Sequence, residues 1–223
     1  MTSDQIRDGF AAAKNRGIEI YDSLALRIKL PPIPHPFPAE IPPEDEGRCL
    51  VVPQVFQADF FSCGAIAGWT VLKAIYPDRG RSDHISFYVS CNPSPKNGTP
   101  TTRLVKALRA HQVRVSVKRK KATFTDIKRA IDAAAPVIAC IKKPGKDYNH
   151  WVTIFGHRKR SKQNGEGKWV YLSNNGWPIL GSDDDRVMPW ERFKGLQVDE
   201  WLVCTGKAQI AQKVLRSNLA RSK

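Results

Sequence analysis

The chain has 223 residues and a mass of 25.0 kDa; 41% of its residues are hydrophobic and 26% are charged. This balance is typical of a soluble globular protein and excludes a collagen-like or mostly disordered chain. No apolar run reaches the roughly 18–20 residues of a membrane-spanning helix, and none at the amino terminus resembles a secretory signal. We therefore expect a cytoplasmic protein without a membrane span, although export without a signal would leave no such mark.

Positive charge is in clear excess along the chain. The sequence contains 36 Lys and Arg against 21 Asp and Glu, which gives a formal net charge of +15 and a pI of about 9.8. Residues 103–129 alone hold ten Lys or Arg and a single acid, Asp126. Such a balance favours an acidic protein or peptide, or nucleic acid, as a partner. A solvated basic face without a partner is the simpler interpretation.

Cysteine usage argues against a metal centre and against a disulfide framework. The five cysteines form no CxxC pair: Cys49, Cys63, Cys91, Cys140 and Cys204. Structural zinc sites usually take their ligands in closely spaced pairs. In a protein without an export signal, thiols are expected to stay reduced.

The first 47 residues form a predicted N-terminal extension. Seven prolines fall among residues 31–43. Each proline fixes its own φ and restricts the residue before it, so this segment is predicted to be a stiff polyproline-like strap. The extension is interpreted as lying on the main domain or tethered to it, with a pro-segment or a docking arm for a partner as alternatives.

The main domain is predicted to span residues 48–206, followed by a basic tail at 207–223. Three stretches show helical spacing of apolar residues: 61–76, 101–112 and 124–135. Alternating or apolar runs predict four strands, at 113–118, 136–142, 150–157 and 168–173. The polar loop between the last two strands indicates a hairpin. Helices gathered before strands are typical of an α+β fold rather than of an alternating parallel one.

Cys63 has the sequence context of a nucleophile. It stands in the first turn of the helix predicted from QADFFSCGAIAGW, where Ser62 can cap the helix. Unpaired N–H groups and the positive end of the helix dipole favour a thiolate at that position. Gly64 directly after it leaves room for a substrate to approach the sulfur. A buried structural cysteine is the alternative interpretation.

Three further residue types complete a candidate site around Cys63. His150 opens a predicted strand, where an imidazole could pair with the thiolate. Asn174 and Asn175 end the next strand, and either carboxamide could orient the imidazole. Gln57 lies six residues before Cys63, and its amide could donate a hydrogen bond to a developing oxyanion.

The remaining histidines and three tryptophans receive simpler interpretations. Trp69 and Trp151 are predicted to be core residues, whereas Trp177 could line the substrate site and shield the imidazole from water, with plain packing as the alternative. The other four histidines are predicted to lie at the surface: His35, His84, His111 and His157.

In this chain order, Gln57, Cys63, His150 and Asn174 resemble the site of papain-like cysteine peptidases, most closely the family of bacteriocin-leader (double-glycine) peptidases. The matching strings are QADFFSCG, NHWVTIFGH and VYLSNNGWP, and the similarity covers roughly residues 50–205. Those peptidases usually have Asp-Pro at the orienting position, whereas this chain has Asn174-Asn175-Gly176. Papain itself uses Asn, so the orienting role is compatible with either asparagine.

The resemblance implies an α+β, papain-like cysteine protease fold, in which a helical half bearing the nucleophile packs on an antiparallel sheet bearing the His and Asn. It implies peptide or amide hydrolysis through a Cys63 thioester, with no cofactor and no metal. An amidase, a deamidase or a transglutaminase-like acyl transferase would use the same nucleophile and base. A non-catalytic basic module that binds nucleic acid or an acidic partner is the alternative from another class.

Overall fold

The computed structural model describes residues 45–53, 55, 57, 61–142, 148–160, 167–173 and 187–206. Contacts divide the chain into residues 1–35 and 36–223, and every described residue belongs to the second unit. Most of the predicted extension, including the proline strap, and the tail at 207–223 lie outside the described residues. Their proposed roles stay predictions.

The described part of the chain contains one seven-stranded antiparallel sheet with the order β2-β7-β3-β4-β5-β6, and β1 also pairs with β4. The strands are β1 (Glu46–Cys49), β2 (Arg114–Lys118), β3 (Val137–Lys142), β4 (Asn149–Arg160), β5 (Gly167–Ser173), β6 (Val187–Pro189) and β7 (Gln197–Thr205). The predicted hairpin is confirmed as β4–β5. The last strand, β7, lies inside the sheet between β2 and β3.

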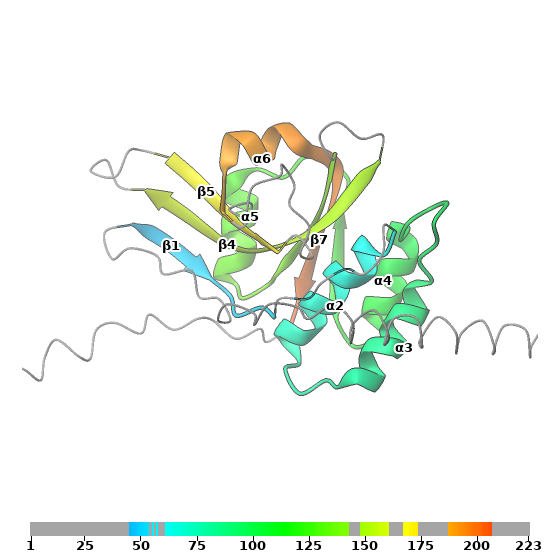
Figure 1. Cartoon of the computed structure of the whole chain (residues 1–223). Coiled ribbons are helices and arrows are strands. Elements are labelled where there is room, and N and C mark those ends of the chain that lie inside the picture. The colour runs from blue at the N-terminus through cyan, green and yellow to red at the C-terminus, as the bar shows by residue number, and fades with distance from the viewer. Residues whose placement is uncertain are drawn as a thin grey trace, which may run out of the picture. The chain divides into compact units, whose positions relative to one another are not determined.

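Helices pack on both faces of this sheet. They are α2 (Cys63–Ile75), α3 (Arg81–Cys91), α4 (Thr101–Ala110), α5 (Phe124–Asp132) and α6 (Trp190–Leu196). Figure 1 shows α2, α3 and α4 grouped together beside the sheet. The hydroxyl of Thr153 donates to the carbonyl oxygen of Ala67 over 3.1 Å, which fixes α2 on one face of β4. A bulge between Ile154 and Gly156 then places His157 on the opposite face, against α5.

Burial explains why α2 is the central helix of the helical group. All of its residues except Lys73 are buried, because the strands lie on one side of it and α3 and α4 on the other. Trp69 is 6% exposed, so its predicted core position is confirmed. Gly68 lets the helices approach closely, since an added Cβ there would lie 2.7 Å from atoms of both Leu104 and Phe87. Among the described residues, no helix is long and apolar enough to cross a membrane.

The surface position predicted for His84 is wrong. Its ring stacks on Trp69 with 4.7 Å between ring centroids and 20° between planes, and its side chain is only partly exposed. Burial lowers the pKa of His84 from 6.5 to about 4. His111 is also partly buried, with its ring edge-on to Phe87 at 5.4 Å. Both histidines therefore belong to the packing of α3 and α4.

This packing predicts a loss of stability in mild acid. The pKa of His84 is lower in the folded state than in the unfolded state. Its contribution to the free energy of unfolding is therefore fully present above pH 6.5 and is lost as the pH falls toward 4. The free energy of unfolding should fall by at most about 2 kcal/mol between pH 7 and pH 5 from this residue. Urea unfolding at the two pH values should show a smaller decrease in His84→Phe, which keeps an aromatic ring on Trp69. An equal decrease in both proteins would contradict the assignment.

Candidate active site

The candidate nucleophile begins helix α2. Cys63 is the first helical residue and is 7% exposed. Ser62 occupies the N-cap position as predicted, but its side chain forms no capping hydrogen bond. The N–H of Ala65, the third helical residue, instead donates to the hydroxyl oxygen of Thr99 over 3.3 Å. The thiol therefore lies at the positive end of a helix whose first turn is held by a residue 34 positions later in the chain.

The candidate base lies at the start of β4, beside this helix end. His150 is the second residue of β4 and is 6% exposed. The residue after it, Trp151, contacts the residue after Cys63: a Cβ added to Gly64 would lie 2.9 Å from Cδ1 of Trp151. Gly64 follows Cys63 and Trp151 follows His150. Because Gly64 and Trp151 are in contact, Cys63 and His150 lie at the same end of the sheet. Trp151 is buried, which confirms its predicted core position.

Gly64 has a packing role that the sequence did not indicate. A Cβ on Gly64 would lie 2.7 Å from Cβ of Thr99 as well as close to Trp151. Real Cβ atoms do not tolerate such distances without a shift of the surroundings. The missing side chain thus allows helix α2, the loop before α4 and the start of β4 to meet. Its predicted role in admitting substrate stays a prediction.

Of the other predicted site residues, the structure describes Gln57. Gln57 is buried, six residues before Cys63. Strand β5 ends at Ser173, which pairs with Thr153 near the start of β4. Asn174 and Asn175 follow Ser173 directly in the sequence, and they lie outside the described residues, as does Trp177.

The remaining cysteines differ chemically from a nucleophile. None of the five forms a disulfide. Burial raises the pKa of Cys49, Cys91 and Cys140 to about 12, and it also raises that of Cys204. Nearby Cys63 and Glu200 add to the shift at Cys140, which places this thiol close to the helix start. These four side chains stay protonated near neutral pH. No group of three or more His, Cys, Asp or Glu side chains in the described part could hold a metal ion.

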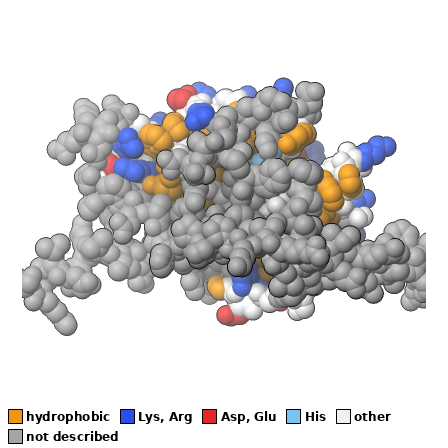
Figure 2. Space-filling view, in the orientation of Figure 1, with side chains coloured by type: hydrophobic (Ala, Val, Ile, Leu, Met, Phe, Trp, Pro, Cys, Tyr) orange, Lys and Arg blue, Asp and Glu red, His pale blue; other side chains and the backbone are white. Residues whose placement is uncertain are grey.

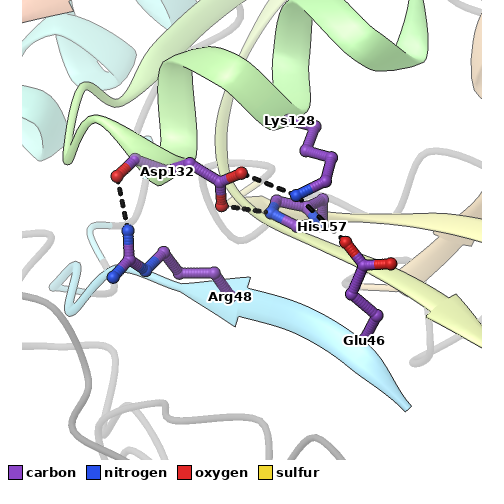
Figure 3. Close-up of polar contacts among 5 residues, drawn as sticks. All are labelled: Glu46, Arg48, Lys128, Asp132 and His157. Atoms are coloured by element: carbon purple, nitrogen blue, oxygen red, sulfur yellow. Dashed lines mark hydrogen bonds and ion pairs between the residues drawn. The ribbon is translucent and has the colours of Figure 1, made fainter.

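A second polar cluster lies toward the other end of β4 (Figure 3). Nε2 of His157 lies 2.8 Å from Oδ1 of Asp132, and Lys128 bridges Asp132 and Glu46 at 2.7 and 3.1 Å. The guanidinium of Arg48 donates to the backbone oxygen of Asp132. These contacts fasten β1 to α5 and β4. The cluster stands about seven residues, or roughly 23 Å, along the strand from His150, so it is separate from the candidate site.

The surface position predicted for His157 is therefore wrong. Its side chain is 2% exposed and packs edge-on against Phe124, with 6.1 Å between ring centroids. Burial lowers the pKa of His157, although the hydrogen bond to Asp132 opposes this shift. The basic residues after His157 predict a loop and hence an exposed histidine. Strand β4 instead continues to Arg160, beyond the predicted end of the strand, so His157 lies within the sheet.

Comparisons with known proteins support the fold independently of sequence. No protein-family model matches the chain, and no curated protein does. A C39-like peptidase from Bacillus anthracis matches in structure with a TM-score of 0.50 and 10% identity, over 73% of this chain and 99% of that one.

Two further solved structures are similar, with lower TM-scores. The peptidase domain of Streptococcus ComA, a bifunctional ABC transporter, matches with a TM-score of 0.49 and 15% identity, over 69% of this chain and 97% of that one. A double-glycine motif protease from an AMS/PCAT transporter, solved with its leader peptide, gives 0.47 and 18%, over 70% and 92%.

The predicted fold class is thus confirmed. The chain has the α+β fold of C39-like, papain-like peptidases, with the helical half first and the antiparallel sheet second.

Proposed function

We propose that the protein is a cysteine-dependent hydrolase that cleaves a peptide or amide bond through a thioester on Cys63. The contact between Gly64 and Trp151 carries this proposal, because it brings the start of α2 against the start of β4. The helix end favours a thiolate. An imidazole at the adjoining strand end suits the general base of such a pair.

In the proposed mechanism, the thiolate of Cys63 attacks the carbonyl carbon while His150 carries the proton. The tetrahedral oxyanion is stabilised by the N–H of Cys63 and the amide of Gln57, each worth about 3–4 kcal/mol. The C–N bond then breaks, and the imidazolium of His150 gives its proton to the leaving amine. His150 next takes a proton from water, which attacks the thioester and releases the thiolate. Asn174 or Asn175 would orient the imidazole.

We further propose that the substrate is an acidic peptide or protein segment. Exposed Lys and Arg side chains follow one another along α4, β2 and the loop after β2: Arg103, Lys106, Arg109, Arg114, Lys118, Arg119, Lys120 and Lys121. The described surface in Figure 2 likewise shows Lys and Arg in more places than Asp and Glu. Of the acids nearby, the carboxylate of Asp126 accepts hydrogen bonds from the backbone N–H and the hydroxyl of Thr123, and Glu200 accepts one from Thr101. Asp199, which precedes Glu200 near the start of β7, is exposed.

The strand pairings support a link between this basic surface and the candidate site. Ala122, at the end of the basic loop, forms two hydrogen bonds with the side chain of Gln197, at 2.8 and 3.3 Å. Gln197 pairs with Ile141, and Ile141 pairs with His150. Neighbouring strands lie about 4.8 Å apart, so Gln197 and His150 are separated by roughly 10 Å. A bound peptide could therefore reach the basic loop and the candidate site together.

The proposed thiolate–imidazolium pair can be tested by alkylation. Iodoacetamide labelling, read by peptide mass spectrometry, should modify Cys63 at pH 6 on the order of 100-fold faster than an ordinary thiol. The advantage should vanish in His150→Ala. Cys49, Cys91, Cys140 and Cys204 serve as internal controls, because burial keeps them protonated. Labelling of Cys63 at the rate of these four thiols would refute the proposal.

Alternative reactions share the first steps and differ in their products. An amidase or deamidase would release ammonia, and a transglutaminase-like enzyme would pass the acyl group to an amine. Product analysis by mass spectrometry separates these from peptide cleavage. A nucleic-acid-binding module would instead bind oligonucleotides with a steep salt dependence and equally well after Cys63→Ala.

A further inference from the structure

One residue outside the predicted site joins the two elements on which the candidate catalytic residues lie. Thr99 is 3% exposed in the loop between α3 and α4. Its hydroxyl oxygen accepts the N–H of Ala65 in the first turn of α2 over 3.3 Å. Its carbonyl oxygen accepts the indole N–H of Trp151, the residue after His150, over 3.2 Å. Both contacts are buried, so water does not compete for them.

The loop around Thr99 is itself held in place. Ser94 and Gly98 exchange two backbone hydrogen bonds of 2.9 and 2.8 Å, and Gly98 has a φ of +58°, which favours glycine. On the other side, α4 begins at Thr101, whose hydroxyl donates to Glu200 of β7 over 2.6 Å. Hydrogen bonds on both sides of Thr99 therefore fix its position in the loop.

We infer that Thr99 is a positioning residue, which sets the distance and angle between the thiol of Cys63 and the imidazole of His150. This inference rests on the proposed function. Thr99 acts through its hydrogen bonds to Ala65 on the helix and to Trp151 on the strand. Because it holds both elements at once, a change at Thr99 alters the geometry between them and not only the stability of each.

The test compares Thr99→Val, which keeps the shape but removes the acceptor hydroxyl, with Thr99→Ser, which keeps the hydroxyl. Thr70→Val is the matched control, because Thr70 is also buried and its hydroxyl donates to the carbonyl oxygen of Ile66 within α2. The readout is the pH profile of Cys63 alkylation. A misplacement of about 1 Å can cost 10²-fold, so Thr99→Val should slow labelling at pH 6 roughly tenfold or more and move the profile to higher pH. Thr99→Ser and Thr70→Val should keep the wild-type profile.

The outcomes separate this inference from the proposed function. If wild-type labelling depends on His150 while Thr99→Val keeps the wild-type profile, the positioning role is wrong and the hydrolase proposal stands. If Thr70→Val shifts the profile as much as Thr99→Val, the effect is general loosening, and the inference is again overturned. If wild-type Cys63 shows no enhanced labelling, both fall. Should Thr99→Val fail to fold by circular dichroism, Trp151→Phe removes the other bond and is judged by the same profile.

Discussion

Replacing Cys63 with serine is expected to abolish hydrolysis, with a loss of at least about 10³-fold in the rate of peptide cleavage. A serine hydroxyl at the same helix end keeps nearly the same size but does not ionise near neutral pH. The imidazole and the oxyanion donors then lack a nucleophile of sufficient reactivity. A library of fluorescence-quenched peptides, half of it rich in Asp and Glu, provides the assay. Cleavage should be concentrated in the acidic half.

Cys140→Ser is the matched control for this experiment. Cys140 is buried in β3 close to Cys63, and its pKa is raised to about 12, so it does not supply a thiolate. Its replacement should leave cleavage within a few-fold of the wild type. Retention of cleavage in Cys63→Ser, or its loss in Cys140→Ser alone, would assign the chemistry to a different group.

Replacing Gly64 with alanine is expected to produce the largest structural effect of a single methyl group near the site. The new Cβ would lie 2.7 Å from Thr99 and 2.9 Å from Trp151, and neither neighbour is the end of a flexible chain. Overpacking of this kind costs about 1–3 kcal/mol. Urea unfolding should show that loss. Cleavage should fall as well, because the added methyl group pushes the start of α2 away from the start of β4.

Gly195→Ala provides the comparison for this substitution. Gly195 lies in helix α6, and a Cβ there would meet nothing within 4 Å. Alanine is favoured over glycine in a helix by up to about 1 kcal/mol, so this variant should be as stable as the wild type or more so. Equal stability of Gly64→Ala and Gly195→Ala would show that α2 and β4 are not in close contact at this point.

Much of the fold could be predicted, because several segments carry strong local patterns. Helix α5 buries Phe124, Ile127, Ala130 and Ile131 on one face and has a capping box between Thr123 and Asp126. It lies within the predicted segment 124–135 but ends at Asp132, because Ala134 has a φ of +56°. Strand β3 is an apolar run, and β4 contains a mostly apolar run at 151–155, as expected of buried strands. Their positions were predicted to within a few residues at each end.

Other elements could not be predicted, because their patterns are weak. Helix α3 was missed: among its described side chains, Phe87 and Cys91 are the ones fully buried, so its apolar face is narrow. Strand β7 was also missed, since its first half includes the exposed Asp199 and the partly exposed Glu200, and its burial comes from neighbours distant in sequence.

Of the candidate site, local context could indicate a thiol at a helix start and a histidine at a strand start. The contact between Gly64 and Trp151 joins residues far apart in the sequence, and the two hydrogen bonds of Thr99 span 34 and 52 residues, so no local pattern reveals them. Asn174, Asn175 and Trp177 lie outside the described residues, so their roles stay predictions.

The place of β7 in the sheet has a consequence for synthesis of the protein. Strand β7 lies between β2 and β3, yet it is the last strand of the described chain to leave the ribosome. Until residues 197–205 have been translated, β2 and β3 each lack the partner on that edge, and unpaired edges of this kind invite association with other chains. The hairpin of β3 and β4 can form earlier, because its contacts are local. A chain interrupted before β7 would therefore contain Cys63 and His150 but not the continuous sheet that supports them.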